Sequence, residues 1–269
     1  HESSGSDHAV HSYFSPYGSV GEAVRIITDK IWEIEKSVDD FQILKKAKRT
    51  PVIIISPETD KLPTEGMGEF AKYVTGKSGG MGEVVAALCA GLWERGVPTY
   101  VITPNLKKRF MEKSGIRKDE YIEEIFHVPH DHIKMIDSAL FENYMSPYDG
   151  DPRLTAAEFQ KRIIQSFIRE IISKHEGEGI LHTHDWMAGG IISAYAKLSN
   201  VPLLHTVHNT HTGHIPLEMF YGVNLSELWD NLYISTDSGK QCVDCQAAAI
   251  KSATLVNYVG RRFLEETIN

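Results

Sequence analysis

TGKSGGMGEVVAALCAGLW, at residues 75–93, is the stretch of sequence that decides the fold. An apolar run at 51–56, PVIIIS, precedes it and predicts a buried strand. The stretch itself predicts a helix over 80–93, because apolar residues recur every four positions at Val84, Leu88 and Leu92. The folded part of the chain therefore opens with a strand, a polar loop that contains glycine, and a helix.

The loop that enters this helix has the features of an anion site. Gly79 and Gly80 let backbone N–H groups approach a ligand closely, and the helix dipole favours negative charge at that end. Lys77 adds a full positive charge beside them. A diphosphate is the ligand that this arrangement predicts, and an ordinary tight turn is the alternative. The stretch lacks the G-x-x-x-x-G-K-[ST] spacing of a P-loop and the G-x-G-x-x-G spacing of a dinucleotide fingerprint.

Short apolar runs then alternate with helical patterns along the chain. Further strands are predicted at 98–103, 132–135, 180–183, 203–207 and 254–258, and further helices at 155–174, 187–198 and 240–252, with a last helical turn from Arg261. Repeated strand–helix–strand units of this length predict an α/β fold, a Rossmann-like doubly wound parallel sheet with helices on both faces. We place this domain at residues 50–269.

Residues 1–49 differ in character from the rest. Residues 1–18 are rich in Ser, Gly and His and are predicted to be disordered or derived from a tag. From Val20, apolar residues spaced by three and four predict an amphipathic helical extension. Packing onto its own domain is the simpler interpretation of that helix, and a contact with a partner is the alternative.

Composition narrows the class of protein. The chain has 269 residues, of which 42% are hydrophobic and 24% charged, as in an ordinary globular protein. The net charge is −8, and a chain this acidic does not indicate binding to nucleic acid. No apolar run is long enough to cross a membrane. Three cysteines fit a reducing compartment, and we expect a cytoplasmic protein. The pair Cys242 and Cys245 is interpreted as two small buried residues one helical turn apart, with a redox or zinc role as the alternative.

Polar residues follow three of the predicted strands. Lys77, the pair His184-Asp185 and the pair His208-Asn209 each lie just after a strand. Ligands of parallel sheets gather at the carboxyl ends of the strands, so we expect these loops to meet at one edge.

The many histidines of this region raise the question of a metal. We expect His182 and His184 to point to opposite faces of their strand, and His205 and His208 to differ in face as well. This arrangement makes a metal site with three histidine ligands difficult to form. We expect no metal. Hydrogen bonding of His208 and Asn209 to a polyhydroxyl ligand is the favoured interpretation, with Trp186 as a flat surface for a sugar ring or as part of the core.

Three motifs together resemble a known family. The run KSGGMGEVVAAL at 77–88 is similar to the K-x-G-G-L-G-D-V-x-x-x-L signature of bacterial glycogen synthases and plant starch synthases. HDW at 184–186 and TVHN at 206–209 resemble the H-D-W and T-[IV]-H-N motifs of that family, in the same order and at similar intervals. The resemblance spans about residues 52–266.

The resemblance implies the N-terminal half of a GT-B retaining glucosyltransferase, which moves glucose from ADP-glucose or UDP-glucose to the non-reducing end of an α-1,4-glucan. No cofactor is expected beyond the sugar-nucleotide substrate. The roles that it implies are catalysis by His208 and Asp185, binding of the sugar-nucleotide donor by Lys77, Gly79, Gly80 and Asn209, and acceptor binding by Trp186 and Glu83.

The chain also departs from the family pattern. Glu83 replaces the usual Asp, Met81 replaces Leu, and the residues after Asn209 differ from the usual L-A-Y-Q-G. The resemblance further implies a C-terminal nucleotide-binding domain, absent from this sequence, that supplies the cations for the leaving diphosphate. We therefore expect this polypeptide alone to be inactive. The alternatives are another GT-B transferase with a different acceptor, a non-catalytic glucan-binding module, and a metal hydrolase that uses the histidines.

Overall fold

The structure is a computed structural model that describes residues 49–120 and 130–260. The predicted helical extension before residue 49, the disordered or tag-like start and the helical turn from Arg261 lie outside these residues. Within them, no helix is both long enough and apolar enough to span a membrane.

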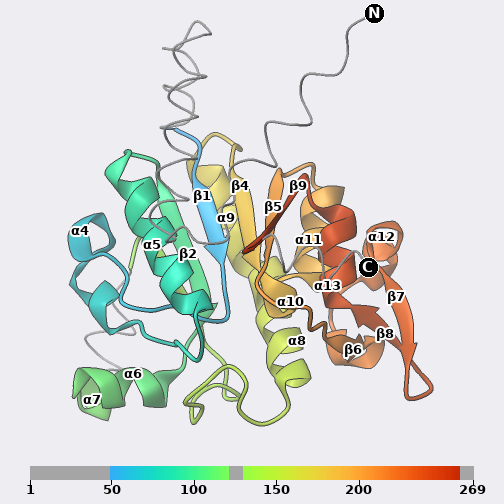
Figure 1. The fold of residues 1–269 in the computed structure, drawn as a ribbon, viewed down its shortest axis with the longest axis horizontal. Coiled ribbons are helices and arrows are strands. Elements are labelled where there is room, and N and C mark those ends of the chain that lie inside the picture. The colour runs from blue at the N-terminus through green and yellow to red at the C-terminus, as the bar shows by residue number, and fades with distance from the viewer. Residues whose placement is uncertain (1–48, 121–129, 261–269) are drawn as a thin grey trace, which may run out of the picture.

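Six parallel strands form the central sheet, in the order β3-β2-β1-β4-β5-β9 (Figure 1). Their bounds are β1 Val52–Ile55, β2 Thr99–Pro104, β3 Ile133–Ile136, β4 Ile180–His184, β5 Leu203–Val207 and β9 Leu255–Tyr258. All six strands predicted from the sequence are therefore present, with ends that differ by at most one residue. The strand order reverses between β1 and β4, and in doubly wound sheets this reversal is where ligands bind.

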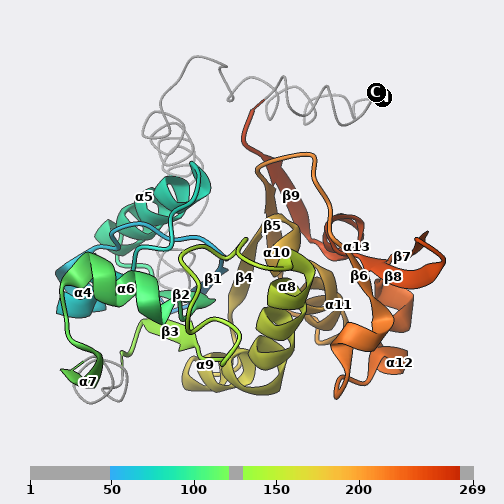
Figure 2. The same cartoon turned by 90° about the horizontal axis from the view of Figure 1, so that it is seen from below.

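Helices cover both faces of this sheet, which confirms the predicted Rossmann-like α/β architecture. Helix α5 (Met81–Glu94) lies on one face, and α8 (Pro152–Arg162) with α9 (Ile168–Lys174) lies on the other (Figure 2). Helix α11 (Gly190–Leu198) packs on β5 and on α13 (Cys245–Ser252).

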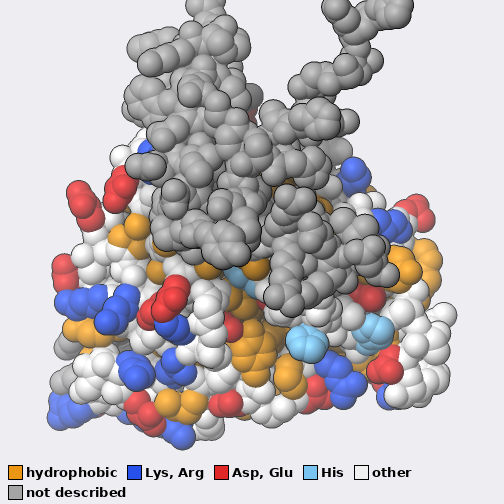
Figure 3. Space-filling model, viewed as in Figure 1, with side chains coloured by type: hydrophobic (Ala, Val, Ile, Leu, Met, Phe, Trp, Pro, Cys, Tyr) orange, Lys and Arg blue, Asp and Glu red, His pale blue; other side chains and the backbone are white. Residues whose placement is uncertain are grey.

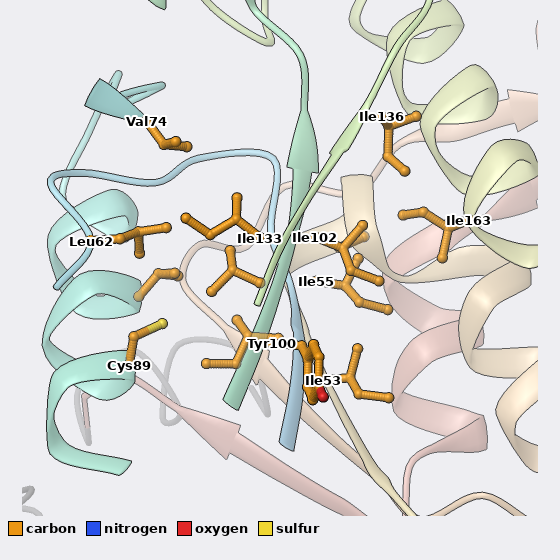
Figure 4. Packing of buried hydrophobic residues seen from close by; sticks show 14 of the residues in the cluster. Ile53, Ile55, Leu62, Val74, Cys89, Tyr100, Ile102, Ile133, Ile136 and Ile163 are labelled. Atoms are coloured by element: carbon orange, nitrogen blue, oxygen red, sulfur yellow. The ribbon is translucent and has the colours of Figure 1, made fainter. Parts of the chain in front are cut away.

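The core lies between the strands and these helices. Figure 4 shows Ile55 and Ile102 of β1 and β2 directed toward Ile163, while Leu62 and Cys89 lie on the opposite side of the strands. Consecutive side chains alternate between the two faces of a strand, so continuous apolar runs fill both layers. The fully buried positions of α5 include Val85 and Cys89, whereas the predicted face of Val84, Leu88 and Leu92 is only partly buried.

Two predicted helices differ in detail from those observed. The helix predicted at 155–174 begins earlier, because the Asp151 side chain accepts a hydrogen bond from Arg153 N–H and Pro152 occupies the first turn. It contains a π-helical segment, η3 (Ile163–Phe167), between α8 and α9. The helix predicted at 187–198 is divided into α10 (Asp185–Ala188) and α11, with Gly189 between them and Gly190, at φ +50°, as the first residue of α11.

A small antiparallel sheet was not predicted. It has the order β6-β8-β7, with β6 His214–Pro216, β7 Ile234–Asp237 and β8 Lys240–Asp244. The prediction of one helix over 240–252 was wrong in its first half, because these residues pair with β6 and β7 as β8. The Asp244 side chain then accepts a hydrogen bond from Ala247 N–H and begins α13. Cys242 and Cys245 are buried free thiols as predicted, but Cys242 lies on a strand and not on a helical turn.

Short helical segments complete the described fold. They are α4 Thr64–Met67, η1 Glu69–Tyr73, α6 Lys107–Ser114, α7 Lys118–Glu120, η4 Leu217–Phe220, α12 Leu225–Leu228 and η5 Trp229–Asn231. The first two of these lie within the segment that joins β1 to α5, and α6 packs against η1.

Candidate active site

Three loops meet at the carboxyl edge of the central sheet, as expected from the sequence. They follow β1, β4 and β5, which are neighbours in the sheet and pair in parallel. The loop after β1 carries Lys77, Asp185 directly follows β4, and His208 directly follows β5. The strand reversal between β1 and β4 separates the first loop from the other two. We call residues 77–80 the glycine loop, and His182, His184, Asp185 and His208 the histidine cluster.

The glycine loop leads into α5 with its backbone N–H groups available. Gly80 is the N-cap of α5, no side chain caps it, and the Val84 N–H donates to the Gly80 carbonyl. The N–H groups of residues 81–83 precede that first helical bond and are the usual unpaired donors of a helix start. Gly82 packs closely, because a Cβ there would lie 3.1 Å from the Thr59 backbone. This geometry agrees with the predicted anion site.

Glu58 is the functional residue that the sequence analysis missed. It follows β1, is only 3% exposed, and its Oε2 accepts hydrogen bonds from the N–H groups of Ser78 and Gly79, both at 2.8 Å. The Tyr148 hydroxyl donates to the other carboxylate oxygen at 2.8 Å, and burial raises the pKa of Tyr148. Glu58 therefore occupies part of the predicted anion site itself and orders the glycine loop. An acidic residue three positions after the end of a buried strand was the available signal.

Lys77 pairs with a residue in the first turn of α5. Its ammonium forms an ion pair with Glu83, which raises the pKa of Lys77, and its side chain is 35% exposed. The Arg109 guanidinium donates to the backbone carbonyls of Thr75, Lys77 and Met145 and fixes the backbone that carries this lysine. Glu83, predicted to bind the acceptor, thus contacts Lys77 in the structure.

Asp185 joins β4 to the loop after β5. Its Oδ1 accepts the His208 N–H at 2.7 Å and its Oδ2 accepts the Asn209 side-chain amide at 2.6 Å. Burial raises the pKa of Asp185 to about 7, against the effect of these hydrogen bonds, and the charge of Glu58 adds to the rise. Asp185 also has φ +56°, which is uncommon for a residue other than glycine. Such strained positions cluster at functional sites.

The histidines form a buried hydrogen-bonded cluster. His184 Nδ1 lies 2.8 Å from His208 Nε2, and His182 Nε2 lies 2.8 Å from the Thr206 hydroxyl. The rings of His182 and His184 are 4.3 Å apart, so the prediction that they point to opposite faces was wrong. Residues two apart on a strand share a face, and only consecutive residues alternate.

Burial keeps these imidazoles neutral. It lowers the pKa of His182 to about 3, that of His208 to about 4, and that of His184 well below its usual range. His205 lies on the other face of the sheet from His208, as predicted, and bonds the Thr183 hydroxyl through Nδ1 at 2.8 Å. Among the described residues, no group of three or more His, Cys, Asp or Glu is arranged to hold a metal ion.

Trp186 is partly buried and packs against a second buried cluster, which includes Ile215, Phe220 and Val243. A Cβ at Gly213 would lie 2.1 Å from its ring, so the indole covers that glycine closely. The packing role considered from the sequence is therefore present. Acceptor binding by Trp186 stays a prediction.

Comparison with known families agrees with this geometry. The sequence model of a family described as the starch synthase catalytic domain matches residues 68–269. The chain belongs to this family. Comparison with curated proteins gives no match. The family match includes the glycine loop, Asp185 and His208, and it begins after β1 and Glu58. Membership places the chain among glycosyltransferases of the glycogen and starch synthase type.

Proposed function

We propose that this chain is the acceptor-side domain of a retaining glucosyltransferase that transfers glucose from ADP-glucose or UDP-glucose to the non-reducing end of an α-1,4-glucan. One observation supports this proposal most. The three sequence motifs follow β1, β4 and β5, beside the reversal of strand order, in a chain that matches the starch synthase catalytic domain. In doubly wound sheets this is the place where nucleotide ligands bind.

The glycine loop is assigned to the diphosphate of the sugar nucleotide. The N–H groups of residues 81–83 and the Lys77 ammonium would neutralise its charge, and Gly79 and Gly80 allow it to approach. Stabilisation of charge that develops on the leaving group is usually the largest catalytic contribution. Lys77 must exchange Glu83 for the diphosphate, which costs little because their ion pair is exposed.

The histidine cluster is assigned to the glucose that is transferred. His208 uses Nε2 toward His184 and is neutral at pH 7, so Nδ1 can bond a sugar hydroxyl without adding charge. Asp185 is a positioning residue, because both its carboxylate oxygens hold the His208-Asn209 segment. Asn209 would contact the sugar nucleotide beside it, and Trp186 and Glu83 the glucan.

The catalytic unit would include a second, nucleotide-binding domain, which would supply further cations for the leaving diphosphate. The test measures incorporation of labelled glucose into glycogen from ADP-glucose and from UDP-glucose. It compares the 269-residue chain with the protein that also carries the second domain. We expect transfer only with both domains. Robust transfer by the chain alone would refute the claim that both domains are needed. Hydrolysis of the donor without transfer, accompanied by bound zinc, would favour a hydrolase.

A further inference from the structure

A cavity of about 290 Å³ lies beside Lys77, outside the histidine cluster. Five of its lining residues are cationic and one is acidic. The cations are Lys61, Lys72, Lys77, Arg109 and Lys113, and the acid is Asp60. The cavity lies between η1, α6 and the segments at 60–61 and 75–77, and Figure 3 shows Lys and Arg side chains gathered on the side of the molecule where Figure 1 places α6.

This gathering of positive charge runs against the composition of the chain. Acidic residues outnumber Lys and Arg by 36 to 28, yet cations surround this cavity. Like charges that converge on one space destabilise the empty protein unless an anion compensates them. Asp60 supplies a single negative charge against these five cations, and its Oδ1 accepts the Lys61 N–H at 3.0 Å and the Thr75 hydroxyl at 3.2 Å.

The lysines of the cavity can reach a ligand. Lys61 and Lys113 are exposed, and neither forms a salt bridge with the acidic side chains that the structure describes. Lys72 pairs with Glu69 and Lys77 with Glu83, and both are exposed pairs of the kind that contribute little and exchange readily. Four ammonium groups from three segments of chain are therefore available.

Arg109 makes the wall of the cavity rigid. Its guanidinium donates to the carbonyls of Thr75, Lys77 and Met145, so its hydrogen bonds are used within the protein while its positive charge remains. A wall fixed in advance lowers the cost of ordering a site when a ligand binds. Tyr73 adds a partly buried ring to the same wall, which suits the apolar face of a small ligand.

We propose that this cavity binds a phosphoryl group, free or carried on a small metabolite, through Lys61, Lys72 and Lys113. Its volume lies at the small end of ligand pockets and fits a phosphorylated monosaccharide better than a polymer. Because Lys77 also lines the cavity, a bound phosphoryl group would compete with the sugar nucleotide for that ammonium. This last step, and only this step, rests on the proposed function.

Calorimetry on the 269-residue chain tests the proposal with three probes: inorganic phosphate, glucose 1-phosphate and uncharged glucose. We expect saturable binding of one or both phosphate probes with a stoichiometry near one, weakened by salt, and none of glucose. Tighter binding of glucose 1-phosphate than of phosphate assigns the site to a phosphorylated metabolite. Equal binding assigns it to the phosphoryl group alone.

Two variants locate the binding. The double substitution Lys61→Ala with Lys113→Ala is expected to weaken it by about ten-fold or more, since each removes a charged partner. Lys108→Ala is the matched control, because Lys108 is exposed on the same helix but does not line the cavity. Absence of saturable binding, or an equal loss in the Lys108 variant, would overturn the proposal. Neither result involves glucosyl transfer, so the proposed function is tested separately.

Discussion

The glycine loop and the histidine cluster lie at the same edge of one sheet but have opposite physical character. The glycine loop is exposed at Ser78–Gly80 and charged at Lys77, and its N–H groups precede the first bond of α5. The imidazoles of the histidine cluster are largely buried and uncharged, and their rings bond other side chains of the protein. The contrast indicates a division of tasks, with one region for the charge of a diphosphate and the other for the hydroxyl groups of a sugar.

Glu58 and Asp185 show how the two regions are fixed. Each is a carboxylate that is 2–3% exposed, and each accepts backbone N–H groups from a loop at the sheet edge. Glu58 orders the glycine loop and Asp185 orders the segment that carries His208. The comparison therefore predicts that loss of either carboxylate disturbs one region more than the other.

Asp185→Ala in the protein with both domains gives the largest expected effect. It removes the acceptor of the His208 N–H, and a displacement of about 1 Å in a positioned group costs roughly a hundred-fold in rate. We expect kcat/KM for glucosyl transfer to fall by about a hundred-fold or more. Asp185→Asn, which keeps an acceptor oxygen, should recover part of the loss. Equal activity of wild type and the alanine variant would refute the role of Asp185 in positioning His208.

Acid should destabilise the fold through the histidine cluster and through His205 on the other face of the sheet. The folded pKa values of His182, His205 and His208 are lowered to about 3, 4 and 4, whereas an unfolded histidine titrates near about 6.5. The unfolded state binds more protons between these limits, so stability is complete above about pH 6.5 and is lost as the pH falls toward 4. Asp185, with its raised pKa, acts in the opposite direction and offsets only part of this loss.

Thermal unfolding at pH 7, 6, 5 and 4.5 measures this loss. Three shifts of this size correspond to several kcal/mol, at about 1.4 kcal/mol per unit of pKa. His205→Gln removes one of these three shifted pKa values, at a residue on the other face of the sheet from His208. This variant should lose less Tm than the wild type between pH 6.5 and 4.5. An unchanged Tm over this range in the wild type would contradict the neutral, buried cluster.

Glu58→Gln should affect the glycine loop and leave the histidine cluster intact. It weakens two bonds from Ser78 and Gly79 to a charged acceptor, each of a kind that contributes about 1.5–3 kcal/mol. We expect the free energy of unfolding in urea to fall by about 2 kcal/mol. Tyr148→Phe is the matched control, because it removes a single hydrogen bond to the same carboxylate and should cost about 1 kcal/mol. A larger loss in the tyrosine variant would refute the role of Glu58 in ordering the loop.

Glu83→Gln gives the smallest expected effect and refines the role of Lys77. It removes the exposed partner of that ammonium and leaves the lysine available to a diphosphate. Affinity for the sugar nucleotide should rise, by less than about three-fold, because exposed ion pairs contribute little. A drop in affinity for the glucan instead would support the acceptor role that the resemblance implies for Glu83.

The parallel sheet could be predicted because its strands are short apolar runs separated by helical patterns. The convergence of three loops on one edge of the sheet could be predicted because Lys77, Asp185 and His208 each come after a strand. The antiparallel strand β8 could not be predicted, because its residues lead directly into the Ala-rich helix α13. Only pairing with β6 and β7 gives these residues their extended conformation. Contacts across the chain override local propensity in such segments.

The contacts of Glu58 are a second feature that could not be predicted from the sequence. Nothing in its local pattern indicates that it would accept hydrogen bonds from Ser78 and Gly79, which are 20 and 21 residues away. The shared face of His182 and His184, in contrast, follows from the period of a strand and could have been predicted.

A crystal structure of the protein with both domains and bound ADP-glucose tests the central claim most directly. We predict that Lys77 Nζ lies within hydrogen-bond distance, about 3 Å, of a diphosphate oxygen, and that a ring nitrogen of His208 lies equally close to a hydroxyl of the glucose. A diphosphate bound away from the glycine loop, or a glucose out of reach of His208, would contradict the account.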